Sequence, residues 1–542
     1  MHFFAALILG VSVASAQRIS APADAKERVD RIFEKYRRTD SPGCVVGATI
    51  DGSTVLSTAY GMADLEHNVP LTPDSVLEPG SIAKQFTAGA ILLLAQARRI
   101  SLDDPVRKYI PEVPQYDQPI TIRQMINHTS GLRDWGSVEA IAGWPRTTRA
   151  YTHANVLEIV SRQKALNYPP GERYSYSNTG FNLAAILVSR VSTKPFPEFT
   201  RDVIFRPLEM NSTQWRDDFQ KIVKNRAVAY QEKDGQFRML MPFENVFGNG
   251  GLLTTVGDLL RWNRNFKDMT VGGPKFVEAQ VQQGKLNNGQ RIAYAAGLMV
   301  LKWRGLNEVS HSGSTAGYQA WLGRYPDQGL SVAVLCNVAS AKATELGHHV
   351  ADVYLGGVIP AREKTTELST DRSVLEALAG IYESDVDHTT VTVESKDGRL
   401  KIRDQVLKAV SLSPLRKVFL IGENETRVEF TNAPGQPAGL IVPSEIDGAH
   451  SYFKRAPVTL TAAEMELLTG EYWNDEAEVA LRVTVEDGGL VIRRRPNAKI
   501  ALTPIGDLTF RSSLGNIWFD RTSREMRVSD PRVWDLRFHR VK

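Results

Sequence analysis

A serine and a lysine one helical turn apart have the spacing that most directly suggests catalysis in this chain. In the segment Glu78-Pro-Gly-Ser81-Ile-Ala-Lys84 they lie three positions apart, which on a helix places both side chains on one face. A serine hydroxyl is a weak nucleophile unless a base lies within hydrogen-bonding distance. We expect the helix to begin at Gly80-Ser81, where the macrodipole lowers the pKa of Lys84 and leaves a neutral amine that can accept the serine proton.

The same serine-lysine spacing occurs at two other places, Ser161 with Lys164 and Ser451 with Lys454. Ser161 lies inside a predicted helix with no glycine before it to mark a helix start. Ser451 lies in a predicted strand, where residues three apart point to opposite sides. The context therefore selects Ser81 as the candidate nucleophile.

A second polar segment, residues 174–180, forms a predicted turn before a helix over 181–191. Tyr176 and Asn178, two residues apart on such a loop, can face one cleft, where the phenol moves protons and the amide donates a hydrogen bond. The structural alternative for Tyr176 is a buried ring with a satisfied hydroxyl. The same Tyr-x-Asn spacing recurs at residues 472–474, where nothing else indicates a site.

A third segment, His311-Ser-Gly313-Ser314, precedes a predicted strand. Glycine at position 313 allows close approach of a substrate. A strand edge also presents a backbone N–H, here that of Ser314, to a developing oxyanion.

The elements that must position these residues alternate in type along the chain. The patterns predict a helix over 24–38, a hairpin over 44–50 and 54–59, mainly helices between about 100 and 300, and strands over 295–301, 318–325 and 330–336. Strands at both ends of a helical middle predict one α+β domain, whose antiparallel sheet is completed by both ends of its sequence.

The C-terminal third repeats itself. Leu378-Ala-Gly-Ile-Tyr382 recurs as Leu468-Thr-Gly-Glu-Tyr472, and a second pair of segments, around Gly398 and Gly488, has the same offset of 90 residues. Each copy carries short alternating strands separated by Asp-Gly and Asn-rich turns. The repeat predicts two small antiparallel β-barrel modules.

These patterns give five segments. We predict a signal peptide over 1–16, a first domain over 17–358, a linker over 359–372, and β modules over 373–457 and 458–542. The first sixteen residues combine an apolar core with an Ala-Ser-Ala cleavage signal, although they lack a basic residue before the core. They predict a secreted or periplasmic protein with no stable membrane span after cleavage.

Composition and charge limit the classes of partner that the protein can be expected to bind. The 542 residues carry a net charge of +4 and are 42% hydrophobic, which is normal for globular domains and gives no concentrated basic face for nucleic acid. The one basic cluster, residues 493–495, is predicted to be a solvated strand end. His348 and His349 are adjacent on a predicted helix and point different ways, so they do not suggest a metal site.

The chain has two cysteines, Cys44 and Cys336. Both lie in apolar β-like runs with no neighbouring histidine or lysine. Export would permit a disulfide, but this pattern favours two buried free thiols.

Taken in order, S-x-x-K, Y-x-N and H-x-G resemble the serine β-lactamase and penicillin-binding-protein superfamily. The likeness is to its class C-like branch, which includes esterases, D-aminopeptidases and D-Ala-D-Ala carboxypeptidases. Segments 127–132 and 250–259 support it, and the resemblance covers roughly residues 25–350. The two β modules look most like the lipocalin-like barrels that follow the hydrolase domain of D-aminopeptidases.

The resemblance implies a role for each residue. Ser81 would form the acyl-enzyme, and Lys84 and Tyr176 would share proton transfer. Asn178 would hold the acyl amide of the substrate, and the backbone N–H groups of Ser81 and Ser314 would form the oxyanion hole. No metal or organic cofactor is expected.

The departure from the family pattern is His311, which together with Gly313 is expected to contact substrate. β-Lactamases and carboxypeptidases of this superfamily usually carry a lysine there that helps hold a substrate carboxylate. A histidine is mostly neutral at pH 7 and supplies less positive charge. The sequence therefore favours amides or esters without that carboxylate.

Three functions remain open at this point. The first is a serine hydrolase of amides or esters, including D-amino-acid-containing peptides, that is, a D-aminopeptidase or esterase. The second is a β-lactamase or D-Ala-D-Ala carboxypeptidase. The third is a catalytically silent, penicillin-binding-like protein that binds cell-wall material. The expected partner in each case is a small molecule or a peptide, with the cell wall as one source.

Overall fold

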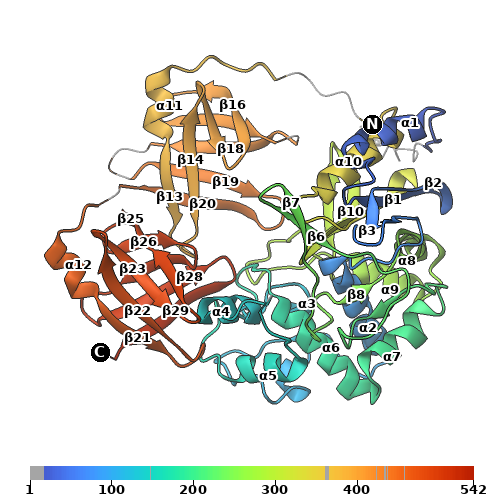
Figure 1. Cartoon of the computed structure of the whole chain (residues 1–542), viewed down its shortest axis with the longest axis horizontal. Helices are drawn as coiled ribbons and strands as arrows, with labels where there is room; N and C mark the ends of the chain where they lie inside the picture. Colours follow the sequence, from blue (N-terminus) through green and yellow to red (C-terminus); the bar gives the residue numbers. More distant parts are fainter. Residues whose placement is uncertain are drawn as a thin grey trace, which may run out of the picture.

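The computed structural model describes residues 18–146, 148–359, 365–422, 424–432, 435, 437–456 and 458–541, and divides them into three parts (Figure 1). A mixed α+β domain comes first, followed by two antiparallel β modules, so the predicted fold class is confirmed. The predicted signal peptide, 1–16, lies outside the described residues. In the described ranges, no helix combines the length and the apolar character needed to cross a bilayer.

The first domain is built on a six-stranded antiparallel sheet of order β2-β1-β12-β11-β10-β9. Its strands are β1 (Cys44–Ile50), β2 (Ser53–Tyr60), β9 (Met299–Trp303), β10 (Leu306–Thr315), β11 (Tyr318–Tyr325) and β12 (Leu330–Cys336). Because β1 pairs with β12, strands from both ends of the domain's sequence meet at the centre of the sheet. This arrangement is the one expected from strands flanking a helical middle.

Alternate residues of the central strands face two separate apolar layers. Val46 and Val334 pack with α1 (Ala25–Ile32) and α10 (Ala343–Leu355) on one side of the sheet. Val45 and Leu335 belong to the larger core on the other side, where the remaining helices lie. A strand that is buried on both faces reads as a continuous apolar run, as CVVGATI does.

The helices of the large core place the segment around Ser81 deep in the domain. They are α2 (Lys84–Gln96), α3 (Ile122–Ile126), α4 (Trp135–Ala142), α5 (His153–Ser161), α6 (Asn178–Ser192), α7 (Phe196–Thr200), α8 (Val256–Asp268) and α9 (Gly273–Val281). Residues 84–92 of α2 are all buried, and α2 packs against α6 and α9. A helix that is buried on every side belongs to the interior of a large domain.

Three predicted elements differ from those observed. The helix predicted over 24–38 ends at Ile32 and is followed by a 3-10 turn at Glu34–Tyr36. The strand predicted over 295–301 begins only at Met299, because a turn joins the Ala295 N–H to the Leu298 carbonyl oxygen. His311 lies inside β10 rather than before a strand.

Each β module begins with a short helix that leads into its first strand. Module 1 has α11 (Arg372–Leu378) and a closed eight-stranded barrel, whose strands are β13 (Gly380–Ser384), β14 (Thr390–Lys396), β15 (Arg399–Ile402), β16 (Gln405–Leu412), β17 (Arg416–Ile421), β18 (Thr426–Thr431), β19 (Gly439–Ser444) and β20 (Gly448–Arg455).

Module 2 has α12 (Ala462–Leu468) and nine strands, which are β21 (Gly470–Asn474), β22 (Val479–Glu486), β23 (Gly489–Arg494), β24 (Ala498–Ala501), β25 (Thr503–Gly506), β26 (Thr509–Ser512), β27 (Gly515–Phe519), β28 (Glu525–Asp530) and β29 (Val533–Arg540). Its sheet is nearly closed, because the edge strands β24 and β25 are separated by Leu502 alone. In both modules a tyrosine hydroxyl of the first strand donates to a carbonyl oxygen of the preceding helix, Tyr382 to Leu378 and Tyr472 to Leu468.

Module 2 packs on the first domain through the basic cluster predicted to be solvated. Arg493 is exposed and forms an ion pair with Glu486. Arg494 donates to the carbonyl oxygens of Ala140 and Ile141, and Arg495 Nε donates to that of Ala142 at 3.0 Å. These carbonyl groups belong to the last turn of α4, where the helix dipole attracts cations. Arg493 and Arg495 are exposed as predicted, and the prediction is wrong for Arg494, which is partly buried against α4.

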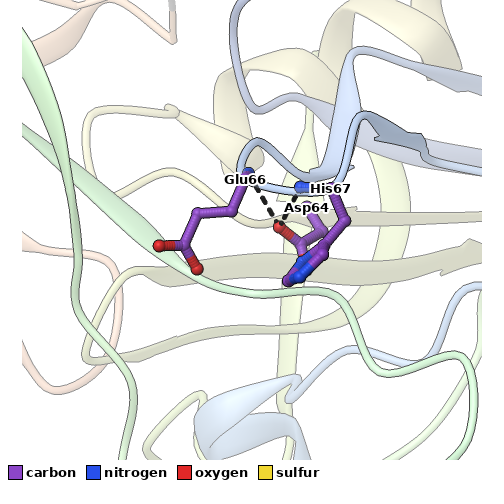
Figure 2. A group of neighbouring side chains, drawn as sticks. All are labelled: Asp64, Glu66 and His67. Atoms are coloured by element: carbon purple, nitrogen blue, oxygen red, sulfur yellow. Dashed lines mark hydrogen bonds and ion pairs between the residues drawn. The ribbon is translucent and has the colours of Figure 1, made fainter.

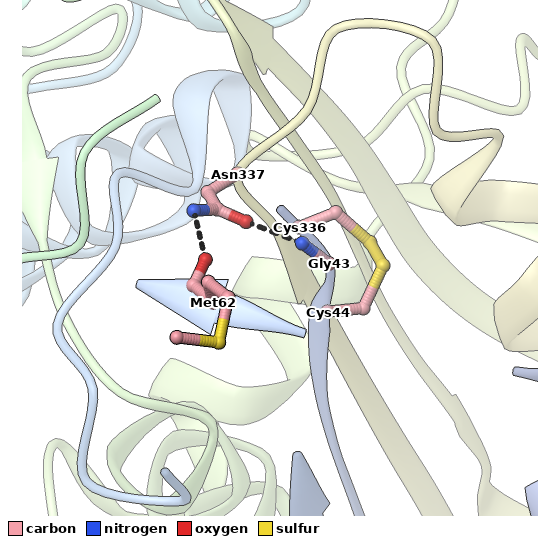
Figure 3. The surroundings of a disulfide bond; sticks show 5 residues. All are labelled: Gly43, Cys44, Met62, Cys336 and Asn337. Atoms are coloured by element: carbon pink, nitrogen blue, oxygen red, sulfur yellow. Dashed lines mark hydrogen bonds between the residues drawn. A yellow bond between two sulfur atoms is a disulfide. The ribbon is translucent and has the colours of Figure 1, made fainter. Parts of the chain in front are cut away.

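Cys44 and Cys336 form a disulfide, so the prediction of free thiols is wrong, although both residues are buried as expected (Figure 3). They lie directly opposite each other in the β1–β12 pair. The next residue, Asn337, accepts from the Gly43 N–H and donates to the Met62 carbonyl oxygen, which fixes the same end of the two strands. Sequence patterns indicated each strand but not which strand was its partner.

We predict that the disulfide stabilises the first domain. A protein folded under oxidising conditions and then unfolded without reductant should show no free thiol. The Cys44→Ala/Cys336→Ala variant should lose about 2–4 kcal/mol of unfolding free energy, because the bond closes a loop spanning most of the domain. Urea unfolding followed by tryptophan fluorescence measures this loss. Two titratable thiols in the unreduced, unfolded protein would contradict the pairing.

Candidate active site

Ser81 and Lys84 lie at the start of α2, as the sequence predicts. A 3-10 turn over Gly80–Ala83 carries Ser81, and the α-helix begins at Lys84. The Lys84 Nζ atom lies 3.2 Å from Ser81 Oγ. The lysine side chain is fully buried, whereas Ser81 remains partly exposed to the cleft. The pair therefore combines a reachable hydroxyl with an amine shielded from water.

Two carbonyl oxygens take up the hydrogen atoms of the Lys84 amine. Nζ lies 2.8 Å from Asn178 Oδ1 and 2.7 Å from the backbone carbonyl oxygen of Asn249. A neutral lysine amine has two N–H donors and one lone pair. With both donors directed at these acceptors, the lone pair is the group left to face Ser81.

The environment holds the pKa of Lys84 well below its usual value. Burial is the largest cause, because it disfavours the charged ammonium, and the nearby cations Arg532 and Arg146 act in the same direction. From the sequence we expected the helix macrodipole to lower this pKa. In the structure, burial of the amine acts in the same direction.

Tyr176 packs between a histidine and the lysine. Its ring centroid lies 4.2 Å from that of His128 and 4.7 Å from Lys84 Nζ. Burial raises the pKa of Tyr176 to about 12, although the Ser81 side chain acts in the opposite direction. The phenol is therefore protonated at neutral pH. The ring is only partly buried, which differs from the structural alternative of a buried ring, and it lines the cleft.

The loop that carries Tyr176 is held by side chains from the segment 127–134. His128 Nδ1 accepts the Ser177 N–H at 3.2 Å, and Asp134 Oδ2 accepts the Asn178 N–H at 2.7 Å. Burial lowers the pKa of His128, which keeps its ring neutral. Asn178 is the first residue of α6, and its side-chain nitrogen makes no hydrogen bond with a described residue, so it is free to meet a substrate.

Two glycines bring β10 against the Ser81 turn. A side chain at Gly80 would meet the Ser314 backbone nitrogen at 2.6 Å, and one at Gly313 would meet the Pro79 carbonyl oxygen at 1.9 Å. Gly80 also has a φ of +53°, which glycine adopts readily. From the sequence we expected glycine at position 313 to allow close approach of a substrate. In the structure it allows close approach of the backbone of residues 79–81. This contact places the Ser314 backbone next to that of Ser81, as an oxyanion hole requires.

His311 is buried and neutral. Its Nδ1 lies 2.5 Å from the Ser312 carbonyl oxygen, which can only accept a hydrogen bond, so Nδ1 carries the proton. Nε2 therefore accepts from the Tyr294 hydroxyl at 3.0 Å. Burial lowers the pKa of His311 to about 4. His311 therefore supplies no positive charge at neutral pH. No sequence pattern indicated its partner Tyr294.

The cleft has a volume of about 1600 Å³ and reaches beyond the first domain. It holds the sequence-predicted residues Ser81, Tyr176, Asn178, His311, Gly313 and Ser314, while Lys84 lies beneath its wall. It continues along module 1, past Thr392 and Arg403, and module 2 contributes Arg532. No site residue of module 2 was predicted from the sequence. Arg532 lies at a hairpin turn, which by itself does not indicate a place in the cleft.

A separate acidic group, Asp64, Glu66 and His67, lies on an exposed turn (Figure 2). Asp64 Oδ1 accepts the backbone N–H groups of Glu66 and His67, and its second oxygen lies 2.8 Å from His67 Nδ1. These hydrogen bonds stabilise the turn, and this explains why the three side chains lie close together.

A model of the family described as Beta-lactamase matches residues 29–355, more than half of the chain. The chain belongs to the beta-lactamase family. The D-aminopeptidase of Cereibacter sphaeroides (strain KD131 / KCTC 12085) is 24% identical over 519 residues, covering 92% of each chain. Unlike the family match, this likeness extends through both β modules.

Two solved structures share the beta-lactamase family fold. The octameric penicillin-binding protein homologue from Pyrococcus abyssi has a TM-score of 0.57 and 24% identity, covering 79% of this chain and all of that one. The D-amino acid amidase from Ochrobactrum anthropi SV3, complexed with L-phenylalanine amide, has a TM-score of 0.51 and 21% identity, covering 61% of this chain and 97% of that one. At these identities the likeness concerns the fold.

We predict that Gly313→Ala lowers kcat by about 100-fold or more while the protein stays folded. The added methyl group would push β10 away from the Ser81 turn, and displacements of about 1 Å in a catalytic arrangement cost about this much. Hydrolysis rates and circular dichroism measure the two properties. Gly257→Ala in α8 is the matched control, because its methyl group would meet nothing closer than 3.8 Å. Equal rates for the two variants would contradict the close-packing argument.

We also predict the direction of the pH dependence. Lowering the pH protonates Lys84 and removes its lone pair, so kcat/KM should fall about tenfold per pH unit below the Lys84 pKa. Above that pKa the rate should stay level up to pH 10, because Tyr176, with a pKa of about 12, remains protonated. Enzyme returned from each pH to pH 8 provides the control for inactivation. A rate that kept rising tenfold per unit to pH 10 would indicate an ordinary lysine.

Proposed function

We propose that this protein is a serine hydrolase that forms an acyl-enzyme on Ser81 with amide or ester substrates. The observation that carries the proposal is the buried Lys84 amine, with both N–H groups bound to carbonyl oxygens and its nitrogen 3.2 Å from Ser81 Oγ. Such an amine can take the proton of the hydroxyl as Oγ attacks the substrate carbonyl.

The other groups then have distinct tasks in the proposed reaction. The backbone N–H groups of Ser81 and Ser314 stabilise the oxyanion of the tetrahedral intermediate. Tyr176, a protonated phenol at neutral pH, donates to the leaving group and is recharged by the proton that Lys84 has accepted. Water then attacks the acyl-enzyme and gives a proton to Lys84, which passes it to Ser81 Oγ as the bond between the acyl group and Oγ breaks. Asn178 holds the acyl portion of the substrate through its free amide nitrogen.

We favour substrates of the D-aminopeptidase and D-amino acid amidase type, with esters as a second group. The likeness to a D-aminopeptidase over 92% of both chains supports this choice, since it includes the modules that border the cleft. The alternative within the family is a β-lactamase or D-Ala-D-Ala carboxypeptidase. A silent binding protein is less favoured, because a receptor has no need for a depressed Lys84 pKa beside a nucleophile.

We further propose that the protein is exported. The signal-peptide pattern over 1–16 supports export, as does the disulfide between Cys44 and Cys336, since such bonds persist in oxidising compartments. Secretion and a periplasmic location both agree with these features.

The test is a panel of D-alanine p-nitroanilide, p-nitrophenyl acetate and nitrocefin, with mass spectrometry of the protein during turnover. We expect hydrolysis of the amide or the ester and an acyl adduct on Ser81. Ser81→Ala should lose about 10³-fold or more of this activity. Ser161→Ala should keep it, since Ser161 shares the spacing to a lysine but lies exposed at the end of α5.

Retention of the main activity by Ser81→Ala would overturn the proposal. Fast nitrocefin turnover would replace the favoured substrate class by the β-lactamase alternative. A protein that turned over none of the three and formed no adduct would point to the binding protein.

A further inference from the structure

The tip of a hairpin from module 2 forms one wall of the cleft beside Tyr176. Strands β28 and β29 are joined by Pro531 and Arg532 alone. The Arg532 side chain lines the cleft, and its guanidinium carbon lies 4.9 Å from the centroid of the Tyr176 ring. A cation of the C-terminal module therefore lies beside the phenol assigned to protonate the leaving group.

The backbone of this tip is fixed without the help of the guanidinium. Asp530 Oδ1 accepts the N–H groups of Arg532 and Val533, each at 2.7 Å. The Arg532 carbonyl oxygen accepts from the Asp134 N–H at 3.2 Å and from Asn167 Nδ2 at 3.0 Å. These bonds hold the backbone of the tip against the first domain, so the guanidinium is not needed as an anchor between the domains.

The guanidinium of Arg532 makes no hydrogen bond or ion pair with any residue that the structure describes. The carboxylate of Asp134, close to it in the fold, is used by the N–H groups of Ser137 and Asn178. Arg146, the other arginine near Tyr176, differs because it forms a bidentate ion pair with Glu244. Arg532 therefore presents an uncompensated positive charge to the cleft, where a bound anion would balance it.

Two basic side chains next to Ser81 do not offer a cation to a substrate carboxylate. The ring of His311 is neutral and bound to Tyr294. Lys84 is buried, and its amine is committed to Asn178, Asn249 and Ser81. Among these groups, Arg532 is the one placed to bind a substrate anion.

We propose that Arg532 binds a carboxylate on the leaving-group side of the substrate, so that module 2 takes part in substrate selection. The assignment of the leaving-group side rests on the proposed function, in which Tyr176 protonates that group. A guanidinium binds a carboxylate through two parallel hydrogen bonds, which fixes its orientation as well as its charge. The positive charge absent at position 311 is then supplied by the neighbouring module, and a substrate ammonium at this place is repelled.

The structure also offers a role for Arg532 without a substrate anion. Its charge lowers the pKa of Lys84 through space. That effect would be the same for every substrate, whereas an anion site separates charged from neutral substrates. The two roles are therefore distinguished by comparing substrates that differ only in charge.

The experiment uses two esters of D-alanine, one with a 3-carboxyphenyl and one with a 3-carbamoylphenyl leaving group. These groups have nearly the same size but differ by one negative charge. We expect the full-length enzyme to have the higher kcat/KM on the carboxylate ester. Arg532→Gln should reduce this preference about 10–100-fold, chiefly through KM, and Arg532→Lys should retain part of it. Arg493→Gln, an exposed arginine of the same module paired with Glu486, should keep both the rates and the preference.

A preference that Arg532→Gln leaves intact would overturn the proposal. An equal fall of kcat on both esters, together with a displaced pH profile, would also overturn it. That result would mean that Arg532 acts only by lowering the pKa of Lys84.

A binding measurement separates this inference from the proposed function. In the Ser81→Ala background, calorimetry compares D-alanyl-D-alanine with its C-terminal amide. We expect Arg532→Gln to weaken binding of the free carboxylate by about tenfold or more, and that of the amide by much less. This result without turnover of either ester would reject the hydrolase and keep the anion site. Turnover of the neutral ester, with equal binding losses for both peptides, would keep the hydrolase and reject the anion site.

Discussion

The burial of one amine beside one hydroxyl is the constraint on which the rest of the site depends. Lys84 has no exposed surface, and a charged ammonium in such a place would be costly unless it were paired with an anion. Its partners are instead two carbonyl oxygens and a serine. This set of partners suits a neutral amine, and a neutral amine is also what the chemistry requires.

That single requirement explains several features of the surrounding fold. The Asn178 oxygen reaches Lys84 because α6 begins at Asn178 and packs against α2. The Asn249 carbonyl oxygen comes from the segment before β8 (Leu252–Leu253). β10 then closes the other side, where the absence of side chains at Gly80 and Gly313 allows two backbones to touch. Segments far apart in the sequence meet at one nitrogen, which only a large, rigid core can arrange.

Residues whose relative positions follow from local spacing could be predicted from the sequence. Ser81 and Lys84 share a helix turn, Tyr176 and Asn178 share a loop, and the 90-residue repeat revealed the two modules. These signals all lie within a short stretch or compare one stretch with another. The completion of one sheet by strands from both ends of the domain could also be predicted, because a helical middle flanked by strands leaves few other arrangements.

Pairings between distant segments could not be predicted in the same way. The disulfide depends on the register of β1 against β12, which apolar runs do not specify. Tyr294 meets His311 only because a turn before β9 folds back over β10. Arg532 reaches Tyr176 through the docking of a separate module, and Pro-Arg in a hairpin carries no sign of that. In each case the sequence shows the type of the residue, but it does not show which distant residue lies next to it in the folded protein.

The most direct test of this account is the protonation state of Lys84 itself. Nuclear magnetic resonance of the full-length protein with lysine labelled at Cε, assigned by comparison with Lys84→Met, follows this one side chain through a pH titration. The account predicts that Lys84 is a neutral amine at pH 8, with its titration displaced far below that of the other lysines. A Lys84 resonance that titrated near pH 10.5 would contradict the central claim.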